Sequence, residues 1–466
     1  MRDGGNDRDG LTRSWMRVTL ASAIAIAVCY ADRSNMSTAI IALASDYELS
    51  KTAQGAVLSA FFYGYGATQI VGGSFADAYG GKWVLLAGCV VWSCATLATP
   101  AAADVGTGVA ALVGARVILG AGEGVAFPAV HAVISRHVPV ERQSTAVAVV
   151  TAASYAGAAV AFAATPPIVS AFGWRAAFYS FGGLMVFWLP LWLPLNLSES
   201  SARNEQRVAL DDDDGEGAID IVEETRRLTS LDEASTPSST ATIAPPPPSS
   251  MAIWRELIKR QEVKAICVAQ FAQSWGMYGL LSWLPTYFHD AQGVELANLA
   301  AFTFVPYILQ GGVGLAVGVI ADDFINTRNV PTRKVRQWAQ GVGMIGPALA
   351  LVVAASPVCD HNPTAAAITV DIGLALSALT LAGVSVSHLD IAPKHAGLVF
   401  ATGNTCATLA GIVGVPLFGV ILDATDQSWP VVFASIAVVY IAGAYYYINA
   451  IDVDDIDADV IRAARM

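Results

Sequence analysis

The sequence predicts an all-α membrane protein with twelve transmembrane helices arranged as two pseudo-symmetric six-helix bundles. Three observations support this fold class. Of the 466 residues, 55% are hydrophobic and only 14% are charged, whereas about a quarter of the residues in soluble domains are charged. Apolar windows of about 20 residues, each long enough to cross a bilayer as a helix, recur along the whole chain. One long polar segment, 196–262, separates six windows from the other six.

The windows predict the elements in chain order. An N-terminal tail (1–16) precedes a first bundle (17–195), the central linker (196–262), a second bundle (263–449) and a C-terminal tail (450–466). The predicted spans are residues 17–43, 53–76, 83–103, 106–134, 144–169 and 174–195 in the first bundle, and 264–288, 297–320, 335–355, 365–388, 394–421 and 429–449 in the second.

The acidity of the chain lies in its polar segments. The formal net charge is −12, and segment 199–250 alone contains twelve acidic and four basic residues. The tail 450–466 adds five Asp and two Arg, so the predicted membrane part is nearly neutral and no nucleic-acid partner is expected. Asp211–Asp214 and Pro245–Pro248 are typical of a disordered linker. An acidic partner-binding motif is the alternative.

Lys and Arg are distributed unevenly between alternate loops. By the positive-inside rule, this asymmetry places both termini and the central linker on the cytosolic side or on its equivalent, such as the stroma. The loops opposite contain little beyond Lys51 and Arg175. The basic residues on the termini side are Lys82, Arg136, Arg142, Arg328, Arg333, Lys334, Arg336 and Lys394.

The two halves share features at equivalent places. Gly73–Asp77 after span 2 matches Gly318–Asp322 after span 8, and both are followed by basic residues. The loop after span 4, His137–Arg142, similarly matches Asp390–His395 after span 10. Such repeats in a six-plus-six chain predict a substrate site between the halves near the bilayer midplane.

Charged residues inside two apolar spans point to the chemistry of this site. Span 1 contains Asp32 and Arg33, and span 4 contains Arg116 and Glu123. An ionised group at bilayer depth costs at least about 2.5–3.5 kcal/mol, so it is expected to face a cavity, a partner or a substrate. Guanidinium groups stay charged and form bidentate hydrogen bonds to phosphate or carboxylate. The arginines therefore suggest an anion pathway; in the alternative, Arg33 pairs with Asp32 or Glu123 only to hold helices together.

The stretch 73–82, Gly-x-x-Ala-Asp-x-x-Gly-Gly-Lys, resembles the loop signature of the major facilitator superfamily. Six further stretches resemble its anion:cation symporter family, which includes sodium–phosphate cotransporters, sialin and vesicular glutamate transporters. The resemblance is closest to plant and algal plastid phosphate (anion) transporters. The stretches are Tyr30–Ser37, Phe61–Gly73, Arg116–Pro128, Gly173–Gly182, Ser274–Tyr287 and His388–Pro393.

The resemblance implies roles for residues of this chain. It implies that Arg33 and Arg116 bind the anion, with further substrate contacts from Tyr65, Gln69, Tyr278 and Gln273. Interhelical hydrogen bonding is the alternative for Tyr65, Gln69 and Tyr278. The predicted coupling or gating residues are Glu123, Asp77, Asp322 and His388. A structural ion pair remains open for Glu123, a helix cap for Asp77, and a packed side chain is expected for His131. Asn35 and Asn404 are weaker candidates for cation ligands.

Three positions depart from other branches of the family. Gln273 and Leu58 stand where vesicular glutamate transporters have arginine and histidine, and Leu119 stands where the sialin group has a glutamate. These departures favour the plastid phosphate branch.

The predicted function is secondary active transport of inorganic phosphate or a small organic anion, coupled to Na⁺ or H⁺, by rocker-switch alternating access. An ascorbate or carboxylate carrier, and a non-transporting nutrient sensor, are the alternatives.

The remaining expectations concern chemistry and setting. No nucleophile–base pair or metal site is apparent in the spans, so we expect neither an enzyme nor a cofactor. The six cysteines mostly lie in apolar spans and suggest small core residues rather than disulfides. The expected partners are a small anion and the lipid bilayer, with a monomeric chain. The expected membrane is the plastid envelope or thylakoid, otherwise a plasma or vesicular membrane.

Overall fold

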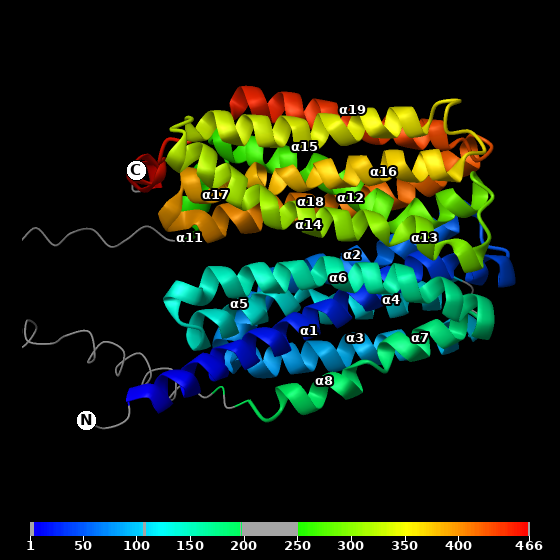
Figure 1. The fold of residues 1–466 in the computed structure, drawn as a ribbon, viewed down its shortest axis with the longest axis horizontal. Coiled ribbons are helices and arrows are strands. Elements are labelled where there is room, and N and C mark those ends of the chain that lie inside the picture. The colour runs from blue at the N-terminus through cyan, green and yellow to red at the C-terminus, as the bar shows by residue number, and fades with distance from the viewer. Residues whose placement is uncertain (1–3, 106–108, 196, 198–249, 465–466) are drawn as a thin grey trace, which may run out of the picture.

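The computed structural model describes residues 4–105, 109–195, 197 and 250–464. Side chains are described from Trp15 onward, apart from those of Ile70, Asp77, Val140, Glu141 and Ser144. The described chain forms two helical halves that lie one above the other in Figure 1, with both termini at the same end. Termini on one side agree with an even number of spans.

The first half runs from blue to green in Figure 1. It contains α1 (Gly4–Asp46), α2 (Lys51–Tyr79), α3 (Gly81–Asp104), α4 (Val109–Gly124), α5 (Ala126–His137), α6 (Val140–Phe172), α7 (Trp174–Gly182) and α8 (Met185–Trp192).

The second half runs from green to red. It contains α11 (Ser250–Leu257), α12 (Gln261–Asp290), η1 (Leu296–Asn298), α13 (Ala300–Thr303), α14 (Val305–Asp322), the π-helical turn η2 (Asp323–Thr327), α15 (Thr332–Ala354), α16 (Pro363–Ser377), η3 (Ala378–Ala382), α17 (Val384–Ile391), η4 (Pro393–His395), α18 (Ala396–Ala424), α19 (Trp429–Ala450) and α20 (Asp457–Ala464).

The predicted fold class is confirmed, with corrections to individual spans. Among the described residues, nine helical segments are long and apolar enough to cross a membrane, and α2, α12 and the pair α7–α8 occupy the other three predicted spans. Span 4 divides into α4 and α5, and span 6 into α7 and α8. Span 10 changes from α16 to the 3₁₀ turn η3 and then to α17. Span 2 continues to Tyr79, so the stretch that begins at Gly73 is largely helical.

The predictions for the two polar segments also need correction. The expected disordered linker 196–262 ends in the helix α11, and the expected acidic tail 450–466 contains the helix α20. Apolar residues of α11 and α20 share a buried cluster at the termini end of the second half, which includes Leu257 and Val460. The signal was the spacing of four residues between apolar side chains, which predicts one buried face of a helix. The net acidity of the two polar segments drew attention away from this apolar spacing.

Close helix contacts position the centre of the first half. A Cβ on Gly64 of α2 would lie 1.9 Å from the carbonyl oxygen of Val117 on α4, and one on Gly120 would lie 2.0 Å from that of Phe61. Only glycine fits at such a backbone contact. The contact places the Phe61 and Tyr65 face of α2 against α4.

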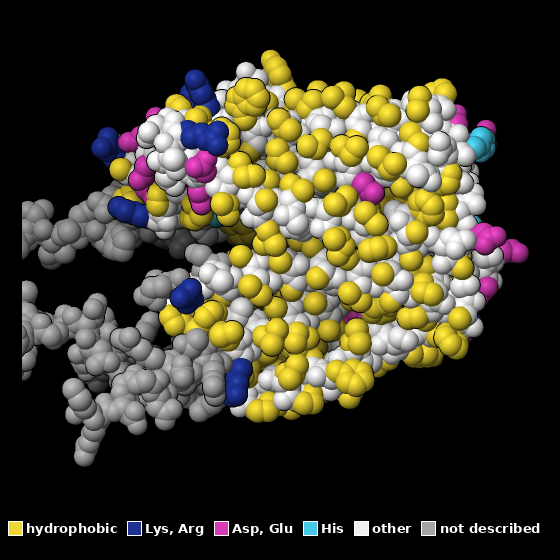
Figure 2. Space-filling view, in the orientation of Figure 1, with side chains coloured by type: hydrophobic (Ala, Val, Ile, Leu, Met, Phe, Trp, Pro, Cys, Tyr) yellow, Lys and Arg dark blue, Asp and Glu magenta, His cyan; other side chains and the backbone are white. Residues whose placement is uncertain are grey.

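The two halves meet at the end of the molecule opposite the termini. There Lys51 of α2 pairs with Asp290 of α12, and Phe162 of α6 stacks on Tyr307 of α14 with ring centroids 4.8 Å apart. Toward the termini, a Cβ on Gly73 of α2 or on Gly397 of α18 would have no atom within 4 Å, so nothing packs on these two positions. Figure 2 shows a gap in the surface between the two halves at the termini end. The chain is therefore closed on the far side and open toward the side of its termini.

Candidate functional site

An ion pair between α1 and α4 forms the centre of the site. The Arg33 Nη2 atom lies 3.0 Å from Glu123 Oε2, and Arg33 Nε donates to the same oxygen at 3.1 Å. The residues are only 5% and 1% exposed. Glu123 Oε1 is buried and has no hydrogen-bond partner among the described residues. The pairing matches the structural alternative for Arg33, and the Cys29 thiol also interacts with the Glu123 carboxylate.

Aromatic rings surround the Arg33 guanidinium. Its Cζ atom lies 4.2 Å from the ring centroid of Phe61, 4.6 Å from that of Tyr30 and 4.9 Å from that of Tyr65. These distances are within the range of cation–π attraction, which strengthens when the cation is desolvated. Tyr65, predicted to contact the substrate, therefore lies beside the Arg33 guanidinium.

Arg116 has unused hydrogen-bonding capacity. It is 2% exposed, and its Nε and Nη1 atoms are buried without a partner among the described residues. Its Cζ atom lies 5.7 Å from the Phe61 centroid, so Phe61 contacts both guanidiniums. Asp32 is fully buried, and neither carboxylate oxygen has a described partner. The site thus combines two bases and two acids that interact electrostatically.

Three predicted substrate contacts lie where the halves meet. Gln69 Nε2 donates to the Tyr65 hydroxyl at 3.3 Å, and the Thr408 hydroxyl of α18 donates to Gln69 Oε1 at 3.5 Å. Tyr278 of α12 packs on Phe62 of α2 with centroids 4.5 Å apart. The Gln69–Tyr65 bond lies within α2, whereas the contacts of Gln69 with Thr408 and of Phe62 with Tyr278 link α2 to the second half in this conformation.

Three other predicted residues have surroundings of their own. Gln273 Nε2 donates to the Thr380 hydroxyl of η3 at 2.6 Å, which ties it into the second half. Asn35 is buried without described partners for its amide, while Asn404 is half-buried on α18. No hydrogen bond joins Asn35 to Asn404 among the described residues, and their role as cation ligands stays a prediction.

Apart from Glu123, the predicted gating residues lie on the termini side. Asp322 is exposed at the end of α14, without an ion-pair partner among the described side chains. His388 is half-buried on α17, with its ring 5.3 Å from that of Phe400. Asp77 lies in the last turn of α2, but its side chain falls outside the described residues. His131, expected to be packed, is instead exposed beside Phe127.

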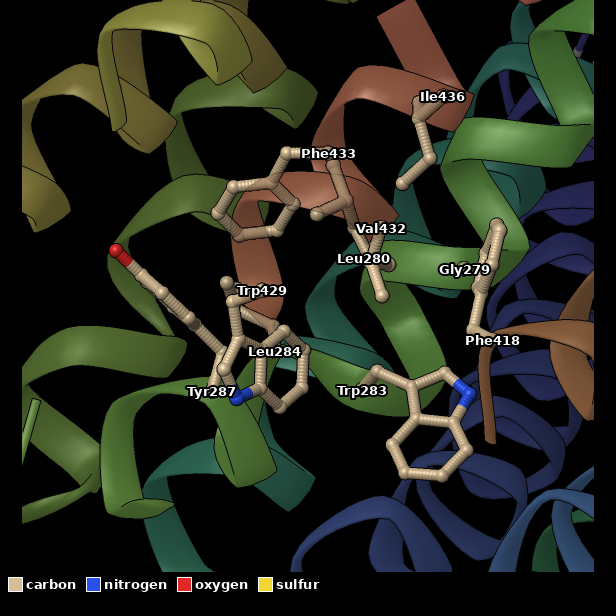
Figure 3. A pocket seen from close by; sticks show the side chains of 10 residues that line it. All are labelled: Gly279, Leu280, Trp283, Leu284, Tyr287, Phe418, Trp429, Val432, Phe433 and Ile436. Carbon is tan, nitrogen blue, oxygen red and sulfur yellow. The ribbon is translucent and has the colours of Figure 1, made fainter. Parts of the chain in front are cut away.

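A separate crevice within the second half is not an anion site. Figure 3 shows it between α12, α18 and α19, with the rings of Trp283, Tyr287, Trp429 and Phe433 around it. Its volume is about 10 Å³, which is room for about one water molecule. Its lining residues include no charged side chain. The aromatic contacts pack α12 onto its neighbours, and Trp283 Nε1 donates to the carbonyl of Val415 at 3.0 Å.

The aromatic surround of the arginines was missed in the sequence. Tyr30 precedes Arg33 by three residues, and Phe61 precedes Tyr65 by four, so each pair shares one helix face. That spacing was a usable signal for Tyr30. The contact of Phe61 with Arg33 and Arg116 depends on how α1, α2 and α4 pack, which no local pattern specifies.

The Major Facilitator Superfamily model matches residues 22–415. Sodium-dependent phosphate transport protein 1, chloroplastic, of Arabidopsis thaliana is 33% identical over 92% of this chain and 78% of its own length. The chloroplastic ascorbate transporter of the same plant is 32% identical over 92% and 73%. Probable anion transporter 4, chloroplastic, of Oryza sativa subsp. japonica is 33% identical over 91% and 66%.

Solved structures support the same fold. A D-xylose-proton symporter has a TM-score of 0.69 at 14% identity, over 94% of this chain and 98% of its own. A bacterial homolog of the human lysosomal transporter Spinster, in an inward-facing unoccupied conformation, has a TM-score of 0.66 at 15% identity, with 97% of each chain covered. The chain therefore belongs to the major facilitator superfamily of membrane transporters, in the family that includes the chloroplast anion transporters of plants.

Proposed function

We propose that this protein carries inorganic phosphate or a small organic anion across a plastid membrane together with Na⁺ or H⁺. The observation that carries the proposal is the guanidinium of Arg116, which is buried with two nitrogen atoms lacking described partners. A buried donor without a partner costs about 1–3 kcal/mol, and more when it is charged. Oxygens of a bound anion would satisfy these donors with charge-assisted hydrogen bonds.

The charge balance of the site supports symport. Arg33, Arg116, Asp32 and Glu123 sum to zero formal charge when all four are ionised. Adding an anion to this buried set creates a net negative charge at membrane depth, which is costly. A proton on Glu123 or Asp32, or a Na⁺ ion beside their unpartnered oxygens, would restore neutrality. Anion and cation would therefore bind together more favourably than either alone.

The position of the site supports alternating access. The arginines belong to the first half, whereas Tyr278 and Thr408 reach the same region from the second half. A ligand shifts a conformational equilibrium only if its contacts differ between the states. An anion on the arginines would gain or lose contacts with the second half as the halves rock, so binding can favour the change.

The aromatic surround favours a second candidate substrate class. Rings of Tyr30, Phe61 and Tyr65 lie against the Arg33 guanidinium, and that of Tyr278 packs on Phe62. Phosphate offers only oxygens, whereas an organic anion such as ascorbate also offers a carbon framework that can pack on rings. The relatives include both a sodium-dependent phosphate transporter and an ascorbate transporter.

Setting and assembly complete the proposal. The curated relatives are chloroplastic, which supports the plastid envelope as the membrane. The basic residues at the termini end (Figure 2) support a stromal location for this side by the positive-inside rule. The site lies within one chain, between α1, α2, α4 and α12, so we propose that a monomer suffices for transport.

The test is uptake of radiolabelled phosphate into proteoliposomes, with a Na⁺ gradient, with a pH gradient and with neither. Wild type is compared with Arg116→Ala and with Arg328→Ala, which removes an arginine whose side chain is 61% exposed. Gradient-driven uptake that Arg116→Ala abolishes and Arg328→Ala retains supports the proposal. If phosphate fails while ascorbate is carried, the organic-anion candidate is correct. If folded protein carries neither anion, the proposal is wrong.

A further inference from the structure

A carboxylate of the second half binds the start of a helix in the first half. Asp423, in the last turn of α18, accepts a hydrogen bond from the backbone N–H of Lys51 at 3.1 Å through Oδ1. Its Oδ2 atom accepts from the N–H and the hydroxyl of Thr52, each at 2.7 Å. These residues begin α2. Asp423 and Lys51 are 372 positions apart in the sequence.

This contact completes the cap of α2. The first four N–H groups of a helix have no partner within the helix. Within α2, the Ser50 hydroxyl accepts from the N–H of Ala53 at 3.2 Å, and the Ser50 carbonyl accepts from that of Gln54 at 2.9 Å. The N–H groups of Lys51 and Thr52 remain, and Asp423 binds both. A negative charge is also favoured at this end by the helix dipole.

Two further contacts hold the same place. The Lys51 ammonium lies 2.6 Å from Asp290 Oδ2 at the end of α12. A Cβ on Gly419 of α18 would lie 2.2 Å from the Lys51 carbonyl oxygen, so the backbones touch. The end of α2 is therefore in contact with two helices of the other half at the far side of the molecule.

We propose that Asp423 is a positioning residue of the transport cycle: by capping α2 across the halves, it stabilises the state closed on the side opposite the termini. Opening that side separates α18 from α2 and leaves the Lys51 and Thr52 N–H groups to water. The contact exists in one state of the cycle and not in the other, which is what a shift of a conformational equilibrium requires. It does not depend on which anion is carried.

Hydrogen–deuterium exchange of the full-length protein in detergent, without added substrate, tests the proposal. The reporters are peptides around Phe162 and Thr303, where the halves meet away from Asp423. In Asp423→Ala, exchange at these peptides should rise about two- to tenfold, because loss of a helix cap typically shifts an equilibrium by this order. Thr52→Val removes only the hydroxyl bond and should give a smaller change in the same direction.

The matched control is Asp426→Asn against Asp423→Asn. Asp426 lies three residues further along and is exposed, so both substitutions remove one charge from the same turn. The proposal is supported if Asp423→Asn raises exchange at the reporters and Asp426→Asn does not. Equal effects of the two would assign the change to surface charge and overturn it. Unchanged exchange in both Asp423→Ala and Thr52→Val would overturn it as well.

Discussion

The Glu123 carboxylate on α4 and the Arg33 guanidinium on α1 meet at 3.0 Å across 90 positions of sequence. The Nε and Nη2 atoms of Arg33 both contact the same oxygen, Glu123 Oε2. An anion that binds Arg33 competes with Glu123 for these N–H groups, and a Glu123 carboxylate that has lost Arg33 is better neutralised by a cation. We therefore expect binding of the proposed anion and cation at this pair to be linked, and such linkage is reciprocal.

Glu123→Gln separates binding from coupling. Gln keeps the size of the side chain and an oxygen that accepts from Arg33, but it cannot bind a proton or a Na⁺ ion as a carboxylate does. We expect exchange of labelled for unlabelled anion to persist, while accumulation driven by a cation gradient falls at least about tenfold. Both are measured in the same proteoliposomes. Gradient-driven accumulation at the wild-type level would leave Glu123 with a purely structural role.

Arg116→Lys tests whether the geometry of the guanidinium matters beyond its charge. Lysine retains the charge but lacks the planar array of donors, so the exchange is not conservative at a bidentate site. Loss of a hydrogen bond to a charged partner costs about 1.5–3 kcal/mol, which predicts an apparent affinity about 10- to 100-fold weaker in Arg116→Lys. Anion binding is measured by titration of intrinsic fluorescence or by KM. Wild-type affinity in this variant would remove Arg116 from the site.

The sequence predicted the charges of the site better than its surroundings. Arg33, Arg116 and Glu123 stood out because an ion in an apolar span is costly, and the structure does place them together. Asp32 stood out for the same reason, but the sequence analysis assigned it no role of its own. The pairing of Arg33 with Glu123 rather than Asp32 could not be chosen, because it depends on the rotation of α1 against α4.

Breaks inside spans were harder to predict. The division at Val125 and the 3₁₀ turn before Gly383 occur within continuous apolar runs, where hydropathy gives no boundary. Glycines were visible, but whether a glycine marks a close contact, as Gly120 does, or a break depends on neighbouring helices. The fold class follows from composition and periodicity, whereas these details follow from packing.

Phe61→Leu tests the role of the ring between the arginines. Leucine keeps an apolar side chain but offers no flat face on which a substrate ring can pack, and contacts between rings contribute about 0.5–1.5 kcal/mol. We expect the affinity for a ring-bearing organic anion to weaken about two- to twelvefold, with a smaller change for phosphate. KM for phosphate and for ascorbate is measured in the same preparation. An equal loss for both anions would mean that Phe61 only orients the arginines.

The Lys51–Asp290 pair should not act as a pH sensor between pH 5 and 8. Burial alone would raise the pKa of Asp290, but hydrogen bonds from His289 and Lys51 and their charges hold the pKa below its ordinary value. A carboxylate with a lowered pKa stabilises the closed state at every pH above its ordinary value, near 4. That contribution is lost only as the pH falls further.

The measurement is hydrogen–deuterium exchange around Phe162 as a function of pH, corrected for the intrinsic rate. It is made in His289→Gln, because the His289 ring contacts Asp290 Oδ1 at 2.8 Å and its removal leaves the Lys51–Asp290 pair to be tested by itself. We expect flat corrected protection from pH 5 to 8 in this variant. A step within that window, absent when Asp290 is also replaced by Asn, would show that the pair does titrate there.

Asp457 distinguishes a docked C-terminal helix from a solvated acidic tail. Its side chain is 1% exposed and accepts a hydrogen bond from the Lys394 N–H at 2.7 Å, just before α18 begins. The N–H of Ile456 also donates to the carbonyl of Ile391 at 2.8 Å. Asp457→Asn loses a charged acceptor in a buried place, which costs about 1–3 kcal/mol and lowers the melting temperature by roughly 2–10 °C.

The matched control is Asp459→Asn, two positions along the same helix, where the side chain is 61% exposed and only 3.7 Å from Arg260. An exposed ion pair contributes little, so this variant should melt within about 1–2 °C of wild type. Thermal unfolding of both detergent-solubilised variants is followed by intrinsic fluorescence. If the tail is solvated, the two aspartates are equivalent and the melting temperatures coincide. Because α20 covers the connection into α18, a lower melting temperature in Asp457→Asn alone would show that the acidic C-terminus is part of the second half.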